Sequence, residues 1–479
     1  MPETINKIEI NPVSRIEGHG KVTIQLDNAG NVDQVRFNVT QFRGFEKFVE
    51  GRVFWEMPVI TPRICGICPV SHHLAAAKAC DAILGVEIPP PAKKLRELLH
   101  LGQFIQSHAM HFFHLASPDL LLGFEADPAS RNVIGLIAAA PDIARQAVMT
   151  RAFGQTIIQK LAGKRIHPSW AIPGGVNAAL SGEDRDELLR NVDAVFPVIH
   201  LGIKLIKEYY AAHRDEVNTF ANFESAYLGL VDRAGNLQFY DGLLRLKDRR
   251  GLVLEDGVDP ADYLSLIEER VEDWSFLKFP YYRKLGYPAG IYRVGPLGRL
   301  NVADGISTPL ANTELAGFRR FAPDTEEMVK GSMYFHLARL IELLHAAEKA
   351  KSLLEDPEIL STDIQVTSNR YNEQGIGVIE APRGTLIHHY WVDRTGKILK
   401  ANLIVATGHN NAAMNRSVYE IARLYIRNGD VREGILNRVE AAIRCYDPCL
   451  SCSTHALGQM PMAIEIVSPA GQLLRRIAR

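Results

Sequence analysis

The chain has 479 residues, of which 47% are hydrophobic and 23% are charged, and its formal net charge is −1. A chain of this length can bury a large core and would ordinarily divide into about three domains. The balanced charge gives no electrostatic reason to expect a nucleic acid or a membrane surface as a partner. No basic region precedes an apolar run at the N-terminus, and no apolar stretch reaches the roughly 18 residues of a membrane span. We therefore expect a cytoplasmic protein without a membrane span.

Apolar and polar residues alternate between residues 7 and 40, most clearly in Lys21–Leu26 and Val32–Val39. This pattern predicts a β-hairpin. Glu17 lies in a glycine-containing loop before the hairpin, and Glu46 lies at the start of a short predicted helix after it. Taken alone, a loop glutamate is usually solvated, and an acid in the first turn of a helix is favoured by the helix dipole.

Apolar residues recur at helical spacing over long stretches of the chain. The first stretch runs from Pro91 to Leu115, and Pro118-Asp119 is predicted to end it. Further long helical patterns cover residues 128–162, 182–218, 324–354, 411–427 and 433–446. The predicted fold is therefore mostly α with small β pieces (α+β), arranged round a central bundle of long helices.

The segments between these helices are less regular. Residues 219–310 are rich in Gly, Tyr, Pro and charge, which predicts short strands and long loops. Further on, Glu380–Gly384 places an arginine between proline and glycine, a pattern typical of a surface turn, and Val405–Asn411 resembles a strand-to-helix turn with asparagine as N-cap. Cysteine motifs near both ends of the chain, described next, would have to meet to form one site, so we expect residues 1–455 to form a single domain.

Four of the six cysteines form two Cys-x-x-Cys pairs, each followed by histidine. Cys65 and Cys68 lie near the start of the chain, and Cys449 and Cys452 lie near its end. Two intervening residues let both sulfurs of a pair reach one small centre, and four thiolates suit zinc, copper(I), iron-sulfur clusters or nickel. A single pair is also typical of a redox dithiol. Since the pairs lie roughly 380 residues apart, whereas a zinc ribbon closes within about 20, a shared site must be assembled by the global fold.

The remaining cysteines, Cys80 and Cys445, are too few to hold a four-cysteine iron-sulfur cluster. If the site carries out redox chemistry, its electrons must therefore pass through another polypeptide. The sequence also lacks a Gly-x-Gly-x-x-Gly turn between a strand and a helix, which would indicate a dinucleotide site. Gly375-Ile-Gly377 matches only the first part of this motif, because Glu380 stands in place of its last glycine. We expect no nucleotide and no iron-sulfur cluster in this chain.

Five motifs occur in the order found in the large subunit of nickel-iron hydrogenases, and the resemblance runs the length of the chain. They are Arg15-Ile-Glu-Gly-His19, Arg43-Gly-Phe-Glu46, Arg63-Ile-Cys-Gly-Ile-Cys68, Ala381-Pro-Arg-Gly384 and Asp447-Pro-Cys-Leu-Ser-Cys-Ser-Thr-His455. Within that family the chain most resembles the cytoplasmic, bidirectional, NAD-reducing type. The segments Cys449–Gln459 and Ile166–Gly175 contribute to this subgroup assignment.

The resemblance implies a metal centre and its ligands. In the family all four motif cysteines, here Cys65, Cys68, Cys449 and Cys452, bind nickel. The second cysteine of each pair, Cys68 and Cys452, also bridges to an iron that carries cyanide and carbonyl ligands. Glu46 and His455 match the ligands of a distant magnesium ion.

The resemblance also implies roles for residues beside the metals. Glu17 matches a glutamate that passes protons, and His72 matches a histidine bonded to a bridging sulfur. Pro382 and Arg383 match residues beside the diatomic ligands. Two acids, Asp119 and Asp447, match carboxylates near that arginine. Heterolytic cleavage of hydrogen needs a soft metal pair and a nearby base, and these residue types supply both.

The family further implies partners and processing. The expected partners are an iron-sulfur small subunit, flavin/NAD diaphorase subunits, a maturation protease and nickel-insertion proteins. The extension at residues 456–479 is expected to be removed after His455 once nickel is bound. A chain that retains it is expected to be either an uncut, nickel-free precursor, or mature-like with the tail at the surface and a strand at Met462–Val467.

Two functions from other classes compete with this interpretation. One is a non-catalytic protein with a structural four-cysteine zinc site. The other is a quinone-site subunit of a respiratory complex, which shares the large-subunit fold. Such homologues lack the four cysteines, whereas this chain has all of them.

Overall fold

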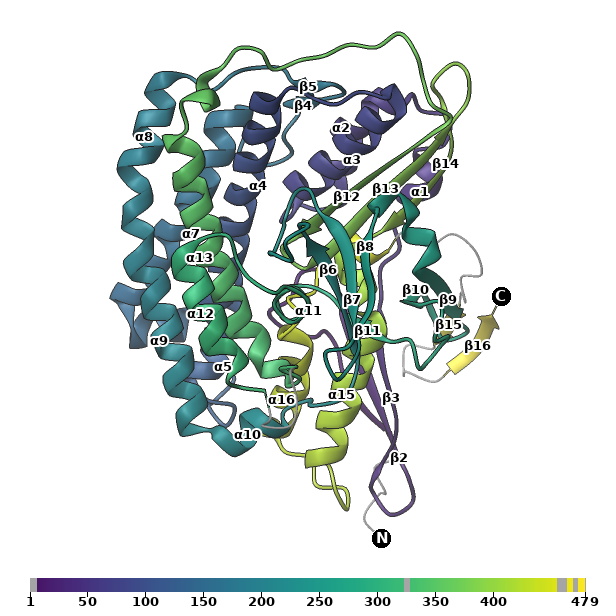
Figure 1. Ribbon diagram of the computed structural model, residues 1–479. Helices are drawn as coiled ribbons and strands as arrows, with labels where there is room; N and C mark the ends of the chain where they lie inside the picture. Colours follow the sequence, from purple (N-terminus) through teal and green to yellow (C-terminus); the bar gives the residue numbers. More distant parts are fainter. Residues whose placement is uncertain (1–6, 323–327, 455–462, 468–472, 479) are drawn as a thin grey trace.

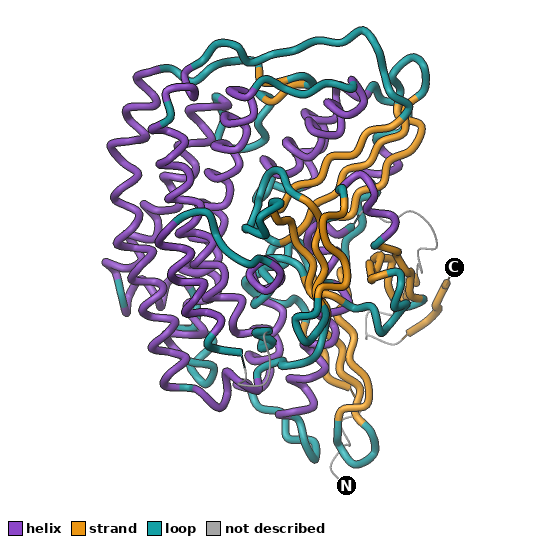
Figure 2. Tube along the Cα trace, viewed as in Figure 1, coloured by secondary structure: helices purple, strands orange, loops and turns teal. Residues whose placement is uncertain are grey.

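The structure is a computed structural model that describes residues 7–322, 328–454, 463–467 and 473–478. Long helices form a bundle on one side of the molecule, and the strands gather on the other (Figures 1 and 2). This confirms the predicted fold class of mostly α with small β pieces. Within the described residues no helix is both long and apolar enough to cross a membrane.

The helices vary widely in length. They are α1 (Phe45–Phe48), α2 (Met57–Ile60), α3 (Pro69–Leu84), α4 (Pro90–Met110), α5 (Ser117–Leu122), α6 (Val133–Ala139), α7 (Pro141–Ala162), α8 (Gly182–Val192), α9 (Phe196–Ala212), α10 (Arg214–Thr219), α11 (Pro296–Val302), α12 (Pro309–Arg319), α13 (Phe335–Glu355), α14 (Ala406–His409), α15 (Asn411–Tyr425) and α16 (Glu433–Arg444). In the bundle α4 packs against α7 and α13, and α13 also packs against α9 and α12. Their apolar residues are buried in one continuous core that extends to the four motif cysteines.

The strands form several small sheets. They are β1 (Lys7–Ile10), β2 (Gly20–Leu26), β3 (Val32–Val39), β4 (Ala171–Ile172), β5 (Gly175–Val176), β6 (Ala226–Val231), β7 (Leu243–Lys247), β8 (Val253–Val258), β9 (Ile267–Glu272), β10 (Ser275–Tyr282), β11 (Tyr292–Arg293), β12 (Gln374–Ala381), β13 (Gly384–Val392), β14 (Ile398–Ile404), β15 (Ala463–Val467) and β16 (Leu473–Ala478). The sheet orders are β1-β2-β3, β11-β6-β7-β8, β12-β13-β14, β10-β9, β4-β5 and β15-β16. The predicted N-terminal hairpin and the short strands within residues 219–310 are confirmed.

Three of the predicted helical stretches differ from the observed helices, and in each a proline lies at a change of element. The helix predicted to end at Pro118-Asp119 passes through a π-helical turn, His111–Ala116, and continues as α5 to Leu122. Pro118 lies in the first turn of α5, directly after the π-helical turn, where the hydrogen-bonding register of the helix changes. Pro141 begins α7, so the pattern over residues 128–162 is divided at Ala140, whose backbone is not helical. In the pattern over residues 182–218, Pro197 lies in the first turn of α9, and a further break at His213 separates α9 from α10.

The helix predicted over residues 324–354 begins only at Phe335. A 3-10 turn, Ser332–Tyr334, comes directly before it, and Val329 and Lys330 are held by tertiary hydrogen bonds. Asn301 donates to the carbonyl of Val329 and accepts from its N–H, and Arg293 donates to the carbonyl of Lys330 at 2.6 Å. These contacts satisfy the backbone that a helix would otherwise have to pair.

Helix α3 and strand β12 pack unusually closely. A Cβ atom added at Gly377 would lie 2.0 Å from the carbonyl oxygen of Ala75, and one at Gly375 would lie 2.1 Å from that of Ala79. Gly375 and Gly377 therefore serve backbone contact with α3 rather than a nucleotide. Because Cys68 is the N-cap of α3 and β12 ends at Ala381, this contact fixes the first cysteine pair relative to Arg383.

The C-terminal segment contains a hairpin. Strand β15 pairs antiparallel with β16, at the right-hand edge of Figure 1. The predicted strand at Met462–Val467 thus corresponds to β15, except that Met462 lies outside the described residues.

Candidate metal centre and its surroundings

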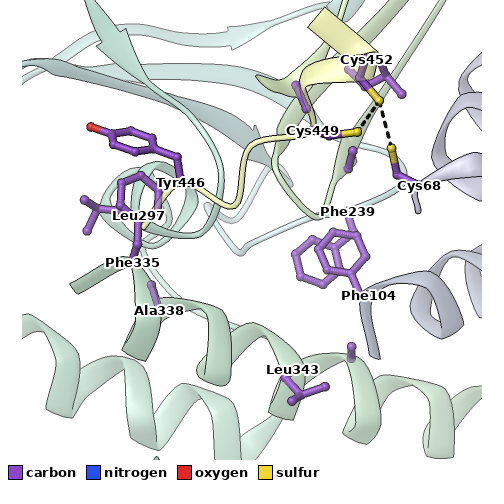
Figure 3. Packing of buried hydrophobic residues seen from close by; sticks show 14 of the residues in the cluster. Cys68, Phe104, Phe239, Leu297, Phe335, Ala338, Leu343, Tyr446, Cys449 and Cys452 are labelled. Carbon is purple, nitrogen blue, oxygen red and sulfur yellow. Dashed lines mark hydrogen bonds between the residues drawn. The ribbon is translucent and has the colours of Figure 1, made fainter. Parts of the chain in front are cut away.

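The four motif cysteines meet at one buried point. Cys65 follows a 3-10 turn (Thr61–Ile64), Cys68 begins α3, and a second 3-10 turn (Leu450–Ser453) follows Cys449 and contains Cys452. The sulfurs of Cys65 and Cys449 are 3.0 Å apart. Those of Cys68 and Cys452 are 3.3 Å apart, and those of Cys449 and Cys452 are 2.9 Å apart (Figure 3). All four sulfurs lie within 4.8 Å of one another, and none forms a disulfide.

The thiols of this cluster do not titrate alike. The sulfurs of Cys449, Cys452 and Cys65, together with a hydrogen bond from His72, lower the pKa of Cys68 well below its usual value. Burial raises the pKa values of Cys449 and Cys452 well above theirs. Only a bound cation can keep four such thiolates ionised together, and soft sulfur donors suit nickel and iron. The residues present therefore fit the expected nickel-iron centre.

Glu17 lies against this cluster. Its Oε2 accepts hydrogen bonds from the sulfur of Cys449 at 3.1 Å and from the N–H of Ser451 at 3.0 Å. Its Oε1 accepts from the hydroxyl of Ser451 at 2.5 Å. The backbone follows the same course, because the N–H of Leu450 donates to the carbonyl of Glu17. Glu17 is half-buried, so its carboxylate connects the sulfur cluster to the molecular surface.

Arg383 lies in a buried two-residue turn between β12 and β13, not in the surface turn that its sequence context suggested. Its Nε donates to the carbonyl of Asp447 at 2.6 Å, its Nη2 to the carboxylate of Asp447 at 3.1 Å, and its Nη1 to the hydroxyl of Ser107. Burial alone would lower the pKa of Arg383, but Asp447 and the cluster sulfurs raise it above its usual value, so the guanidinium stays charged. Conversely, burial raises the pKa of Asp447.

A second buried arginine supports this turn. Arg299 donates to the carbonyls of Ala381 and Pro382 at 2.8 and 3.1 Å. Its charge is balanced by Glu342, which it binds through two hydrogen bonds of 2.6 Å, and by Glu380 at 2.8 Å. The Pro382-Arg383 turn is thus held by Arg299 through its backbone carbonyls and by Asp447 through the side chain of Arg383.

Asp119 has a different set of partners from Arg383. One carboxylate oxygen binds Arg15 and Arg131, and the other binds Arg444. Within the described residues no hydrogen bond or ion pair joins Asp119 to Arg383. Burial alone would raise the pKa of Asp119, but Arg444 and Arg15 outweigh it and lower the pKa below its usual value. The carboxylate therefore serves as the shared counterion of three arginines.

This cluster fixes the loop that carries Glu17. Arg15 also donates to the carbonyl of Leu115 at 2.5 Å, and Arg444 donates to the carbonyl of Ser14 at 2.9 Å. Arg15 has a left-handed backbone (φ 54), a conformation that a long side chain adopts only when tertiary contacts hold it. Asp119 thereby ties the N-terminal loop to the end of α16, just before the second cysteine pair.

His72 extends into a chain of buried side chains. Its Nδ1 lies 3.1 Å from Nε2 of His388, whose Nδ1 lies 2.6 Å from the hydroxyl of Tyr390. These contacts fix the imidazole of His72, which helps to lower the pKa of Cys68.

The expected magnesium site is only partly described, because His455 lies outside the described residues. Glu46 accepts from the N–H of Leu403 at 2.8 Å and from the ammonium of Lys278 at 3.1 and 3.3 Å. Lys278 also reaches the side-chain oxygens of Asn402 and Glu269. Burial raises the pKa of Glu46. These oxygen donors suit a hard cation, but magnesium would have to share them with Lys278.

Three hydroxyl groups at the site carried no signal in the sequence. Ser107 contacts Arg383, Ser451 contacts Glu17, and the hydroxyl of Thr407 accepts from the N–H of Cys449 at 2.9 Å. Thr407 lies in the predicted strand-to-helix turn, and Ser451 lies inside the second Cys-x-x-Cys. The sequence therefore indicated the segments that contain these two residues, but not their contacts.

A helical bundle with small sheets and a buried four-thiol site next to a carboxylate and an arginine defines a class of redox metalloenzymes. Comparison with known families agrees. A family described as nickel-dependent hydrogenase matches residues 43–134 and 231–455, and one described as HoxL-like matches residues 7–42. The chain belongs to the nickel-dependent hydrogenase family, in which it is the large, catalytic subunit.

Individual relatives cover nearly the whole chain. The chain is 44% identical over 488 residues to the NAD-reducing hydrogenase HoxS subunit beta of Cupriavidus necator, covering 99% of each chain. It is 47% identical over 431 residues to a vhu subunit of the F420-non-reducing hydrogenase of Methanocaldococcus jannaschii, covering 88% of this chain and 100% of that protein. A crystal structure of an NAD+-reducing [NiFe]-hydrogenase in the H2-reduced state superposes with a TM-score of 0.91 at 46% identity, covering 94% of this chain and 99% of the other. These matches favour neither the zinc protein nor the quinone-site subunit.

We predict that Cys449→Ser abolishes nickel retention. Serine is a harder and much less acidic ligand than cysteine, so one of the four soft donors is lost. The measurement is nickel and iron content of the purified protein by mass spectrometry. Cys80→Ser is the matched control, because the Cys80 thiol is buried but only donates to the carbonyl of Phe54. Stoichiometric nickel in the Cys449 variant would contradict the assignment.

Proposed function

We propose that this hydrogenase oxidises H2 reversibly to protons and electrons at a nickel-iron centre held by Cys65, Cys68, Cys449 and Cys452. The observation that supports this most strongly is the convergence of four buried, unbridged thiols with a carboxylate 3.1 Å from one of them. When bound, such a centre supplies a soft, electron-rich metal pair that polarises hydrogen. Cys68 and Cys452, whose sulfurs are 3.3 Å apart, would also hold the iron, which would carry cyanide and carbonyl ligands.

In this proposal Glu17 takes up the proton. Its Oε2 lies within hydrogen-bond distance of the sulfur of Cys449, the geometry that a general base requires. Because the side chain is half-buried, it can receive a proton on the inner side and release it towards the surface. Asp119 contributes indirectly, since it fixes the loop through Arg15.

Arg383 provides a fixed positive charge beside the metals. Its planar guanidinium is oriented by Asp447 and stays charged in a site from which water is excluded. It would donate charge-assisted hydrogen bonds to the diatomic ligands of the iron. Pro382 restricts the turn, and His72, which is held by His388, helps to keep the sulfur of Cys68 ionised.

A magnesium ion would bind at Glu46 and His455, where it would stabilise the segment after the second cysteine pair. The buried carboxylate of Glu46 and the half-buried carboxylate of Glu269, which both contact Lys278, supply the negative charge for a divalent cation.

We propose that electrons leave through an iron-sulfur small subunit, from which they pass to flavin/NAD diaphorase subunits. The described residues offer no second cysteine cluster. The cysteine site lies close beneath the surface, because Arg63 and Gly66, which flank Cys65, are exposed and Glu17 is half-exposed. A partner docked there would come near the centre. NAD as the final acceptor is supported by the HoxS relative, which is named NAD-reducing. Such a complex with reduced thiols would function in the cytoplasm.

We predict that Glu17→Gln keeps the metals but abolishes turnover. The amide preserves the shape of the side chain but removes the group that accepts the proton. Nickel content, H2 oxidation and the exchange of H2 with deuterated solvent should be measured on the assembled complex. Glu9→Gln, on the exposed edge of β1, is the control. Exchange at the wild-type rate in the Glu17 variant would place the proton acceptor elsewhere.

We predict that Arg383→Lys also keeps the metals while lowering the rate at least tenfold. An ammonium cannot make the planar set of hydrogen bonds that Arg383 makes to the backbone and side chain of Asp447. The rate of H2 oxidation per bound nickel is the measurement. Arg394→Lys, in an exposed turn, should behave as wild type, and an unchanged rate at position 383 would remove this arginine from the mechanism.

We further propose that residues 456–479 form an extension that a maturation protease removes after His455, once nickel-insertion proteins have loaded the site. Thr454, the last described residue before the gap, is buried, so a continuing chain must leave the core. The domain itself would then comprise residues 1–455.

This maturation model predicts that mass and metal content change together. Protein carrying stoichiometric nickel should have the mass of a chain ending at His455, whereas nickel-free protein should retain the extension. Intact mass spectrometry and nickel analysis of the same preparation test the correlation. Full-length protein with stoichiometric nickel and full activity would contradict it.

A further inference from the structure

Ser451 lies between the two cysteines of the second pair and contacts Glu17 twice. Its N–H donates to Oε2 of Glu17 at 3.0 Å, and its hydroxyl donates to Oε1 at 2.5 Å. Ser451 is 4% exposed, so both donors lie on the buried side of the contact with the half-exposed Glu17. The two donors from one residue hold both oxygens of the carboxylate.

This arrangement gives the two carboxylate oxygens different surroundings. Oε2 faces the sulfur of Cys449, whereas Oε1 faces the hydroxyl of Ser451. Glutamate has three rotatable side-chain bonds, and Glu17 is half-exposed, so a carboxylate without these donors would gain entropy by turning towards solvent. The hydroxyl of Ser451 opposes that rotation, because a hydrogen bond to a charged acceptor is stronger than one between neutral groups.

The backbone prepares the contact from the other side. Leu450 donates to the carbonyl of Glu17, and a Cβ atom on Gly18 would lie 2.8 Å from Cβ of Leu450. Gly18 (φ 85) therefore lets the loop approach the cysteine turn closely enough for Ser451 to reach the carboxylate. Backbone and side-chain hydrogen bonds together position the carboxylate of Glu17. Of these, the hydrogen bond from the hydroxyl of Ser451 is one that a single substitution can remove.

We propose that Ser451 is a positioning residue for proton transfer: its hydroxyl fixes Oε1 of Glu17 so that Oε2 stays directed at the sulfur of Cys449. This inference rests on the proposed role of Glu17 as the proton acceptor. In this role Ser451 neither binds the metals nor gains or loses a covalent bond.

The same turn offers a matched control. Ser453 is also buried, but its hydroxyl donates to the carbonyl of Leu450 at 2.9 Å, inside its own turn. Ser451→Ala and Ser453→Ala therefore remove the same group from the same element, and only the first removes a contact to Glu17.

The variants should be compared in the assembled, metal-loaded complex. For Ser451→Ala we expect wild-type nickel and iron content and an unchanged KM for H2. We expect kcat and H2/D2O exchange to fall by about tenfold, equivalent to ~1.4 kcal/mol. We also expect a larger solvent deuterium isotope effect on kcat, because proton transfer becomes limiting. Ser453→Ala should match the wild type in every measurement.

A second pair of variants keeps the test decisive if Ser451→Ala does not load metal. Ser451→Thr and Ser451→Val have nearly the same shape and differ in the hydroxyl. We expect the threonine variant to exchange at close to the wild-type rate and the valine variant to be about tenfold slower. Equal rates in this pair, or a rise in the KM for H2 with kcat unchanged, would overturn the inference.

Glu17→Gln separates this inference from the proposal beneath it. If exchange collapses in Glu17→Gln but is at the wild-type rate in Ser451→Ala, the role of Ser451 fails and the role of Glu17 stands. If exchange is at the wild-type rate in both variants, Glu17 is not the proton acceptor and both assignments fail.

Discussion

The structure depends on the meeting of two cysteine pairs from opposite ends of the chain. Neither pair alone supplies four ligands. The fold must therefore bring the turn after α16 so close to the start of α3 that the sulfurs of both pairs can bind one centre. Bonds between partners far apart in sequence hold that turn on each side. The loop of Glu17 binds Leu450 and Ser451, the turn of Arg383 binds Asp447, and Thr407 binds the N–H of Cys449. The site is thus built from contacts that only the complete fold provides.

Buried charge is the second constraint on this region, because an unpaired charge in a core is very unfavourable. The charged groups are accordingly arranged in balanced sets. Asp119 balances three arginines, and Arg299 is balanced by Glu342 and Glu380. The arginines of both sets also donate to backbone carbonyls of segments beside the cysteine site. Arg444 donates to Ser14, in the loop of Glu17, and Arg299 donates to Pro382, in the turn of Arg383. The ion pairs therefore act mainly by fixing loops. Arg383, which belongs to neither set, is paired with Asp447, and the charges of Asp447 and of the cluster sulfurs raise its pKa.

The helical layer gives this site a rigid support. The stacked rings of Phe104 and Phe239, with centroids 3.8 Å apart, lie in the core near the cysteines (Figure 3). On the other side, Gly375 and Gly377 allow β12 to contact the backbone of α3. Close packing of this kind transmits the position of one element to the next, so the cysteine at the start of α3 and the arginine after β12 keep a fixed separation.

The sequence by itself determined which residue types form the site and roughly where the helices lie. Cysteine spacing, the Pro-Arg-Gly turn and helical periodicity each reflect chemistry or burial within one short segment, so they can be recognised without the fold. Only the tertiary structure decided that Ser451 holds Glu17, that Asp119 binds Arg15, Arg131 and Arg444, and that Gly375 and Gly377 serve helix packing instead of a nucleotide. It also decided that tertiary hydrogen bonds at Val329 and Lys330 replace the first turns of a predicted helix. The physical reason is that such partners lie tens to hundreds of residues apart, and the choice between competing hydrogen bonds is made by packing, which no local pattern records.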